Sequence, residues 1–574
     1  MLTKIQVATK FVTIAFVCLF FILLAPQQQD TGNKAKAPPV AYIVQAGSLD
    51  QALSAVRNVG GEITHELGII NAVGARLTSE QRDALDADQK IRIYQNRKAR
   101  VADLVDPYNT SEGTVSNSVE LEYGEVVGSN SLHAEGVDGR GVTVAVIDTG
   151  LWWHKNAISR NSQGQDRVLA RYDAIADQLV DEDTPGSGND DSGHGTHVSS
   201  IALHSKNHSG RFIGIAPAAD LVSVKAFGAD GSGTYLDVIR ALDFVVAFKQ
   251  DYGIGVLNLS FSASPQSYYW DDPLNQAVMA AWQAGIVVVA SAGNIGPDPM
   301  TIGVPGNVPY VITVGAMNDN YTPYDPSDDM LSSWSSAGPT IEAFVKPELV
   351  APGGHLSGYM PTDGFLPQNY PEFYDSGQYF MMSGTSQAAA VVSGVVALLL
   401  QDEPGLSPDD VKCRLMTTTQ VGIYKRGRYS DELRYSPFQQ GAGRVDAYDA
   451  VYGDIIGCAN GGLDIDLDLA GIEHYIGPVR IDAYGNFYIE GVGYHWDGTL
   501  DQKGDLWVDG NPFVDGNPFV DGNPFVDGNP FVDGNPFVDG NPFVDGNPFV
   551  DGNPFIDGGG LAESASINVW VEGD

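Results

Sequence analysis

The sequence predicts an α/β protein with a doubly wound, mostly parallel sheet, preceded by a small α+β domain and followed by a repeat tail. Three observations lead to this prediction. Residues 136–455 alternate short apolar runs with helical segments. Residues 40–101 carry elements in the order βαββαβ, the split-βαβ pattern. Residues 508–555 repeat the hexapeptide VDGNPF eight times without variation.

The apolar runs of the central region predict strands that are buried on both faces. Strands of this kind, alternating with helices, are typical of a parallel sheet covered by helices on each side. The expected strands are 142–147, 220–226, 256–260, 286–290 and 311–314, and the expected helices are 235–249, 273–284 and 386–400.

The small domain is delimited by the linker TGNKAKAPP at 31–39 and by a polar, Ser/Asn/Glu-rich junction over 102–135. Its helix over 49–59 ends at a Gly-Gly pair, and a second, short helix starts at Ser79 with Glu80 and Gln81 close by for N-terminal capping. The expected strands are 41–44, 62–66, 70–77 and 91–94.

The N-terminus predicts an export signal over residues 1–26. Lys4 and Lys10 precede an apolar stretch of fifteen residues, 11–25, interrupted only by Thr13. This length suits a signal peptide and falls short of the roughly 20 residues of a spanning helix. We therefore expect a secreted protein, extracellular or periplasmic. The alternative is an uncleaved membrane anchor, because Pro26 makes a poor cleavage site.

Charge and cysteine content exclude several classes of function. The chain has 72 acidic and 32 basic residues, a net charge of −40, which argues against nucleic acid as a partner. The acidic run 181–191 could bind calcium, or it could be a solvated loop. Cys18 falls in the signal, so Cys413 and Cys458 allow at most one disulfide. No Cys/His spacing indicates a zinc site.

Three motifs place polar side chains at strand or helix ends. AVIDTG puts Asp148 at the end of a buried strand, where catalytic groups gather in α/β sheets. SGHGTHVSSIA puts His194 at a helix start, with His197 three residues on. MSGTSQAAAVVSGVVALLL puts Ser386 at the start of an apolar helix. Taken singly, each has an alternative: a turn cap, a structural or zinc-binding histidine, and an ordinary N-cap.

The three residues together fit nucleophilic serine catalysis. That chemistry needs a serine, a histidine base and a carboxylate that orients the histidine. The chain order Asp, His, Ser is that of subtilisin and differs from the orders in chymotrypsin and the α/β-hydrolases. A fourth segment, VVVASAGNIG, ends a strand with Asn294, whose amide could donate a hydrogen bond to an oxyanion.

The region 125–455 resembles the subtilases, the subtilisin-like serine peptidases. The resemblance rests on VAVIDTG, HGTHVSSIA, NLSFS, VVASAGN and SGTSQAAA, in that order. It implies a subtilisin-like fold in which Asp148 orients His194 and His194 takes the proton of Ser386. Asn294 and the backbone N–H of Ser386 would then hold the oxyanion. Residues 40–101 resemble the inhibitor propeptide of the same family.

The resemblance also implies a substrate cleft with two edge strands, between which an extended peptide would add as a third strand. One edge is expected at Gly231, Ser232 and Gly233, and the other at Ser260, Phe261 and Ser262. Ser291, Ala292 and Gly293 would line the pocket for the side chain before the cut. Because these residues are small, we expect the pocket to admit large apolar side chains.

The implied protein is a serine endopeptidase exported as a zymogen, acting on proteins or peptides without a cofactor for the chemistry. Its propeptide would inhibit it in cis and be removed by a cut between about 100 and 125. Ala390 stands where the family usually has proline, which predicts retained but altered activity. The alternative from another class is a non-catalytic adhesin or scaffold on the same fold. An esterase is disfavoured by the chain order and by the absence of a GxSxG elbow.

Overall fold

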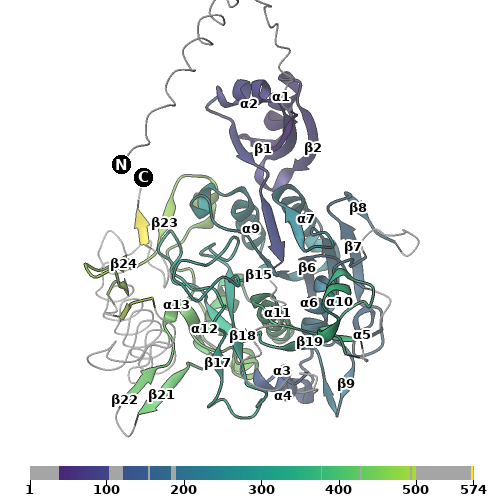
Figure 1. Cartoon of the computed structure of the whole chain (residues 1–574), viewed down its shortest axis with the longest axis vertical. Helices are drawn as coiled ribbons and strands as arrows, with labels where there is room; N and C mark the ends of the chain where they lie inside the picture. Colours follow the sequence, from purple (N-terminus) through teal and green to yellow (C-terminus); the bar gives the residue numbers. More distant parts are fainter. Residues whose placement is uncertain are drawn as a thin grey trace, which may run out of the picture.

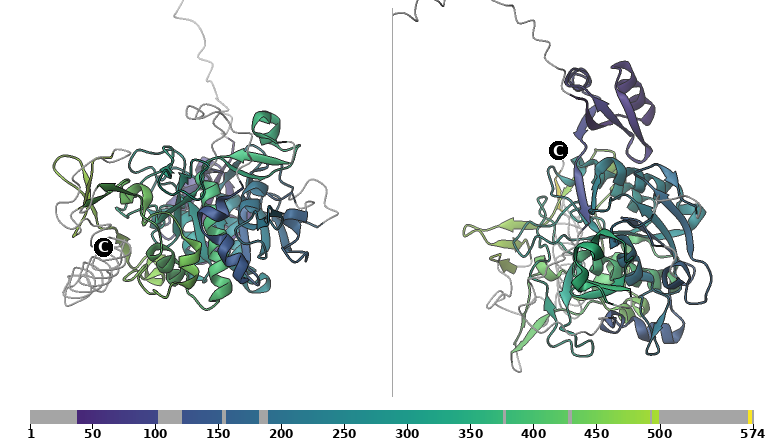
Figure 2. Two further views of the ribbon diagram at one scale, coloured as in Figure 1. Left: turned by 90° about the horizontal axis from the view of Figure 1, so that it is seen from below. Right: turned by 45° about the vertical axis from the view of Figure 1, so that its right-hand side comes forward.

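The computed structural model of the chain describes residues 38–101, 121–152, 156–181, 189–375, 378–426, 430–491, 494–498 and 570–572. A small unit, residues 38–101, projects from one side of a larger body (Figures 1 and 2). The predicted signal at 1–26 and the repeats at 508–555 lie outside the described residues.

The larger body is built on a nine-stranded sheet. Its strands from β7 through β18 pair in parallel, while the two-residue strands β8 and β17 pair antiparallel at its two sides. The predicted mostly parallel sheet is therefore confirmed. The spatial order is β17 (Met330–Leu331), β16 (Ile312–Asn318), β15 (Val287–Ser291), β13 (Ile254–Leu259), β6 (Thr143–Asp148), β11 (Asp220–Lys225), β7 (Val168–Asp173) and β8 (Gln178–Leu179), with β18 (Leu349–Pro352) beside β16.

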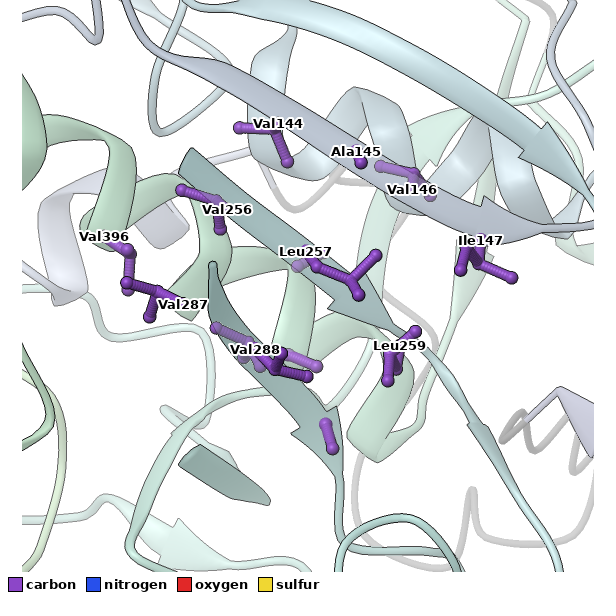
Figure 3. Close-up of a cluster of buried hydrophobic side chains, with 14 of the residues drawn as sticks. Val144, Ala145, Val146, Ile147, Val256, Leu257, Leu259, Val287, Val288 and Val396 are labelled. Carbon is purple, nitrogen blue, oxygen red and sulfur yellow. The ribbon is translucent and has the colours of Figure 1, made fainter. Parts of the chain in front are cut away.

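The core of this body lies around the three central strands. Every residue of β6 is buried, so its side chains meet apolar neighbours on both faces of the sheet. Figure 3 shows Val144 to Ile147 of β6 with side chains of β13, β15 and Val396 of helix α11 (Thr385–Asp402). Each fully buried aliphatic side chain contributes about 1.5–3 kcal/mol. This packing holds the carboxyl ends of the central strands in fixed positions.

Two pairs of helices pack on the sheet. Helix α6 (His194–Leu203) lies against α11, and α7 (Tyr235–Ala247) lies against α9 (Pro273–Gln283). Helix α11 is buried around its whole circumference, since 16 of its 18 residues are buried and most of them are apolar. Within the described part of the chain it is the one helix long and apolar enough to cross a membrane, and 89% of it is buried inside the protein.

The small unit is a four-stranded antiparallel sheet with two helices. The chain runs β1 (Val40–Gln45), α1 (Leu49–Asn58), β2 (Glu62–Leu67), β3 (Ala72–Leu77), α2 (Ser79–Asp86) and β4 (Arg92–Gln95), and the sheet order is β2-β3-β1-β4. Thr78 and Gln81 form a reciprocal capping box at the start of α2. Val44, Ala52, Val56 and Leu77 belong to its separate core.

The small unit packs on α7 and α9 of the larger body. Asp243 of α7 accepts hydrogen bonds from the backbone N–H groups of Gly68 (2.9 Å) and Ile69 (3.1 Å). Gln45 of β1 donates to Gln276 of α9 at 2.7 Å. These contacts hold the small unit against α7 and α9. The chain then leaves the unit and continues as strand β5 (Lys98–Val101).

Residues 456–498 pack onto the larger body instead of leaving it directly. The buried carboxylate of Asp468, in α15 (Ile465–Leu469), accepts hydrogen bonds from the hydroxyls of Tyr269 (2.6 Å) and Tyr310 (3.0 Å). The hairpin sheet β24 (Val479–Ile481), β25 (Phe487–Ile489) and β26 (Tyr494–Trp496) places Trp496 over Phe438, with ring centroids 5.5 Å apart. Strand β23 (His474–Ile476) pairs with β27 (Trp570–Glu572).

A disulfide fastens this C-terminal region to the body. Cys413, buried in α12 (Pro408–Thr417), is bonded to Cys458, with Cα atoms 5.2 Å apart and a separation of 45 positions in sequence. A cross-link over such a span removes conformational freedom from the unfolded chain. It therefore stabilises the fold where residues 456–498 begin.

Replacing both cysteines by serine is expected to lower the free energy of unfolding by about 2–4 kcal/mol. Urea unfolding followed by tryptophan fluorescence would measure the loss, in a Ser386→Ala background so that self-digestion cannot contribute. Reduction of the unsubstituted protein should shift its unfolding midpoint in the same direction. Equal midpoints with and without the disulfide would contradict the prediction.

Candidate active site

The site lies at the carboxyl edge of the sheet, where β6 and β11 end side by side. Asp148 is the last residue of β6 and stands opposite Lys225, the last residue of β11. Asp148 is 1% exposed. Lys225 Nζ donates to the carbonyl oxygens of Thr149 (2.9 Å) and Asn189 (3.0 Å) and lies 3.1 Å from Asp191 Oδ2. The lysine thereby ties the loop after β6 to the loop before α6.

Asp148 and His194 are brought together as a buried pair. His194 Nδ1 lies 2.7 Å from Asp148 Oδ1, which also accepts the backbone N–H of Thr149 at 2.7 Å. A carboxylate only accepts hydrogen bonds, so Nδ1 carries the proton. This tautomer makes Nε2 the basic nitrogen of the ring.

Asp190 holds the start of α6, and with it His194. Its Oδ1 accepts from Thr149 Oγ1 (2.7 Å) and from the backbone N–H groups of Ser192 (3.2 Å) and Gly193 (2.8 Å). Its Oδ2 accepts the N–H of Thr196 at 2.7 Å. These bonds satisfy donors that a helix N-terminus leaves without partners. In the sequence Asp190 falls within the acidic run 181–191, and its place shortly before a helix start is the capping signal that distinguishes it.

His197 takes no part in a histidine pair with His194. Its Nε2 donates to the carbonyl oxygen of Phe380 at 2.9 Å. Complete burial, with the neighbouring His194 as a further cause, lowers the pKa of His197 to about 3, so the ring stays neutral. Across the described ranges no group of three or more His, Cys, Asp or Glu side chains could hold a metal ion. The described geometry therefore gives the zinc alternative no support.

Ser386 is held against the end of β13 by a reciprocal pair of hydrogen bonds. Its Oγ donates to the carbonyl oxygen of Ser260 at 3.0 Å, and Ser260 Oγ donates to the carbonyl oxygen of Ser386 at 3.0 Å. Asn258 donates to Ser260 Oγ at 2.8 Å and accepts from Ser393 Oγ at 2.9 Å. Helix α11 continues through the buried Ala390 without a break. The serine is thus positioned from both the sheet and its own helix.

Asn294 presents an amide donor beside the start of α11. Its Oδ1 accepts from the backbone N–H (3.0 Å) and the hydroxyl (2.9 Å) of Thr385. The same hydroxyl accepts the N–H of Gly293 at 3.1 Å. Asn294 Nδ2 is buried and has no hydrogen-bond partner among the described residues. Thr385 therefore holds the Asn294 amide with Oδ1 toward the start of α11 and leaves Nδ2 to face the site. Thr385 was not predicted as a site residue, although its position directly before Ser386 could have indicated this role.

The two predicted edge strands flank a segment of the chain itself. Strand β5 lies between β12 (Ser232–Thr234) and β14 (Phe261–Ser262) and pairs antiparallel with both. Figure 1 shows β5 running from the small unit into the larger body. Arg100 stands opposite Ser232 and Ser262, Ala99 opposite Gly233, and Val101 opposite Phe261. The N–H of Val101 also donates to the carbonyl oxygen of Gly231 at 3.0 Å. The two expected edges therefore flank an extended strand of the chain itself, and their binding of a substrate peptide stays a prediction.

The segment predicted to line a side-chain pocket lies next to β14. Ser291 Oγ donates to the carbonyl oxygen of Phe261 at 3.0 Å, and both Ser291 and Ala292 are fully buried. Gly293 precedes Asn294 directly, so this buried segment leads into the amide donor. Ile295 beyond it is 66% exposed.

Three carboxylates of the acidic run 181–191 lie within the described ranges. Asp190 caps α6, and Asp191 pairs with Lys225. Residues 182–188 lie outside the described residues, so the calcium expectation stays a prediction for that stretch.

Comparison with known proteins places these motifs in a family. The model of the subtilase family (Peptidase_S8) matches residues 139–443. Serine protease AprX of Bacillus subtilis is 37% identical over 321 residues, which are 55% of this chain and 67% of that protein. Subtilisin DY of Bacillus licheniformis is 31% identical over 300 residues, 52% of this chain and 90% of that protein.

Two further comparisons cover more of this chain. Bacillopeptidase F of Bacillus subtilis is 28% identical over 432 residues, which are 70% of this chain but only 27% of that protein. The crystal structure of fervidolysin from Fervidobacterium pennivorans, a keratinolytic enzyme related to subtilisin, matches with a TM-score of 0.55 and 24% identity. That match covers 78% of this chain and 64% of fervidolysin and supports the fold alone.

Proposed function

The chain belongs to the subtilase family of serine endopeptidases, and from this premise we propose that Asp148, His194 and Ser386 hydrolyse peptide bonds in protein substrates. The observation that carries the proposal is the buried 2.7 Å hydrogen bond from His194 Nδ1 to Asp148, at the end of a cleft that holds an extended strand. We assign Asn294 to the oxyanion hole. The alternative of a non-catalytic adhesin finds no support in the comparisons.

In the proposed mechanism, His194 Nε2 takes the Ser386 hydroxyl proton as Oγ bonds to the scissile carbonyl carbon. The carbonyl oxygen becomes an oxyanion, which accepts hydrogen bonds from Asn294 Nδ2 and the backbone N–H of Ser386. As the C–N bond breaks, the imidazolium gives its proton to the departing amine. Water then repeats the sequence on the acyl-enzyme and releases the acid. No cofactor is needed, and calcium, if bound in the 181–191 run, would be structural.

We further propose that residues 40–101 are a propeptide that inhibits the peptidase region, 125–455. The support is β5, which occupies the cleft in the manner of a substrate. Val101 pairs with Phe261, and one step further along that edge is Ser260, whose carbonyl oxygen accepts the Ser386 hydroxyl. We therefore expect the first cut in the chain after Ala102. Export as a zymogen, directed by residues 1–26, completes the proposal, together with a C-terminal region over 456–574 whose first part, 456–498, packs on the body.

An active-site label tests the function directly. A fluorophosphonate should phosphonylate Ser386 alone in the processed protein, and casein hydrolysis should fall in proportion to the label. Peptide mass spectrometry locates the modified residue, and sequencing of the new N-terminus locates the first cut. Full hydrolysis by a completely labelled protein, or a label on another serine, would refute the assignment.

Replacing Asn294 by alanine is expected to lower kcat by about 10²–10³-fold with little change in KM, a loss of the size known for an oxyanion-hole asparagine in subtilisin. The reason is that the amide would bind the oxyanion and not the ground-state carbonyl. Steady-state kinetics on a peptide anilide would measure both constants. A rise in KM at constant kcat would instead indicate a role in ground-state binding.

A further inference from the structure

The proposed function requires a pocket for the side chain before the scissile bond, and two segments of the cleft bound the space where it is expected. On one side runs the edge from Ser260 to Ser262, and on the other runs the segment from Ser291 to Gly293, joined by the Ser291 Oγ to Phe261 carbonyl bond. A third segment closes the space between them, because the N–H of Gly303 donates to the carbonyl oxygen of Ala292 at 3.1 Å. Gly293 and Gly303 have no side chains. Their absence alone would leave a deep space between these segments.

The side chain of Ser262 occupies that space. A Cβ atom built on Gly303 would lie 1.9 Å from Ser262 Oγ and 3.2 Å from its Cβ. A Cβ atom built on Gly293 would lie 3.3 Å from the same Oγ. The hydroxyl therefore sits between the two glycines, in the volume that their missing side chains open. Ser262 is half-buried, and its hydroxyl has no hydrogen bond to a described residue.

We propose that Ser262 closes the floor of this pocket and restricts the peptidase to small side chains before the cut, such as alanine, glycine or serine. This inference rests on the proposed function and revises the expectation that small lining residues admit large apolar side chains. Ser291, Ala292 and Gly293 are small, but the side chain of Ser262 projects from the opposite edge into the space beside them. A polar floor also disfavours an apolar side chain, because a hydroxyl covered by it loses its water.

The chain's own cleft segment agrees with a small residue at this position. The bond expected to be cut first follows Ala102, an alanine, and the segment before it is Lys-Ala-Arg-Val. Ala99 and Val101 are buried in the cleft, whereas Arg100 points outward and is exposed. The same four residues therefore provide a natural leader for test substrates.

The test compares peptides Lys-Ala-Arg-Val-Xaa-p-nitroanilide, with Xaa alanine, serine, leucine or phenylalanine, on the purified processed protein. The unsubstituted protein should have a kcat/KM for alanine at least about tenfold above that for phenylalanine. Ser262→Gly should move that ratio toward phenylalanine by about 10–200-fold. Ser262→Ala keeps the Cβ atom and the backbone preference. Its alanine-to-phenylalanine ratio should lie between those of the unsubstituted protein and Ser262→Gly. The matched control Ser264→Gly, at an exposed serine two residues along, should leave the ratio unchanged.

The outcomes separate this inference from the proposed function. Peptide hydrolysis that persists in Ser386→Ala would remove the function and the inference with it. Hydrolysis that depends on Ser386 but prefers phenylalanine in the unsubstituted protein would overturn the inference alone. The inference would also be overturned if the alanine-to-phenylalanine ratio of kcat/KM in both Ser262 variants stayed within about twofold of its value in the unsubstituted protein.

Discussion

Replacing Ser386 by alanine is expected to lower kcat for peptide hydrolysis by about 10⁶-fold, the size known for the serine of subtilisin. Alanine has no oxygen to attack the carbonyl, so neither His194 nor Asn294 can contribute to acyl transfer. The variant should also keep residues 40–101 attached, because the proposed first cut would be made by the protease itself. Gel mass would show the unprocessed chain, and initial rates on casein would show the loss of turnover.

A matched control separates this loss from general damage. Ser131→Ala changes an exposed serine in α4 (Ser129–Glu135), remote in sequence from the site motifs, and should process and hydrolyse normally. Near-ultraviolet circular dichroism should be the same for both variants. Casein hydrolysis by Ser386→Ala within tenfold of the unsubstituted rate would refute the catalytic assignment.

Replacing Asp148 by asparagine is expected to lower kcat by about 10⁴-fold. Asparagine preserves the volume of the side chain at a position that is 1% exposed. It removes the negative charge that stabilises protonated His194, and its amide nitrogen cannot accept the Nδ1 proton. The correct tautomer and the imidazolium are therefore both disfavoured. Single-turnover kinetics on a peptide anilide would isolate the acylation step.

Asp298→Asn provides the control for the lost charge. Asp298 is exposed and lies four residues beyond Asn294, so its substitution changes net charge near the site without touching the pair. It should leave kcat within about twofold, as is usual for surface substitutions. A loss of less than tenfold in Asp148→Asn would mean that His194 is oriented by another group.

The sequence predicted the parts of the fold that local patterns encode. The strands β6, β11, β13 and β15 are continuous apolar runs, and they were expected within two residues of their observed bounds. Strand β7 was not expected, because Arg171 and Asp173 interrupt its apolar pattern. Both side chains are buried in the structure, which only the assembled sheet makes favourable. The predicted helix 235–249 ends earlier, at Ala247, and the chain continues as a separate short helix.

The motif residues of the site could be predicted from the sequence because each lies at the end of a strand or at the start of a helix. The residues that support them could not be predicted in this way. Asp190 and Thr385 act through hydrogen bonds to backbone groups whose positions depend on tertiary packing. Residues 456–498 were assigned to the tail, yet Tyr269 and Asp468 bond across 199 positions of sequence. Ser262 was predicted as a cleft residue, but the direction of its side chain toward Gly293 and Gly303 depends on the packing of three distant segments.

Strand β5 is covalently joined to the body whose cleft it fills, so the two meet at an effective concentration set by the tether. For short connections this is on the order of millimolar, whatever the amount of protein present. Once the chain is cut, the same contacts are governed by bulk concentration. Dilution after export would then release the cleft without any change in the affinity of β5 itself. In the proposed zymogen, the onset of proteolysis would therefore depend on transfer from a crowded compartment to a dilute one.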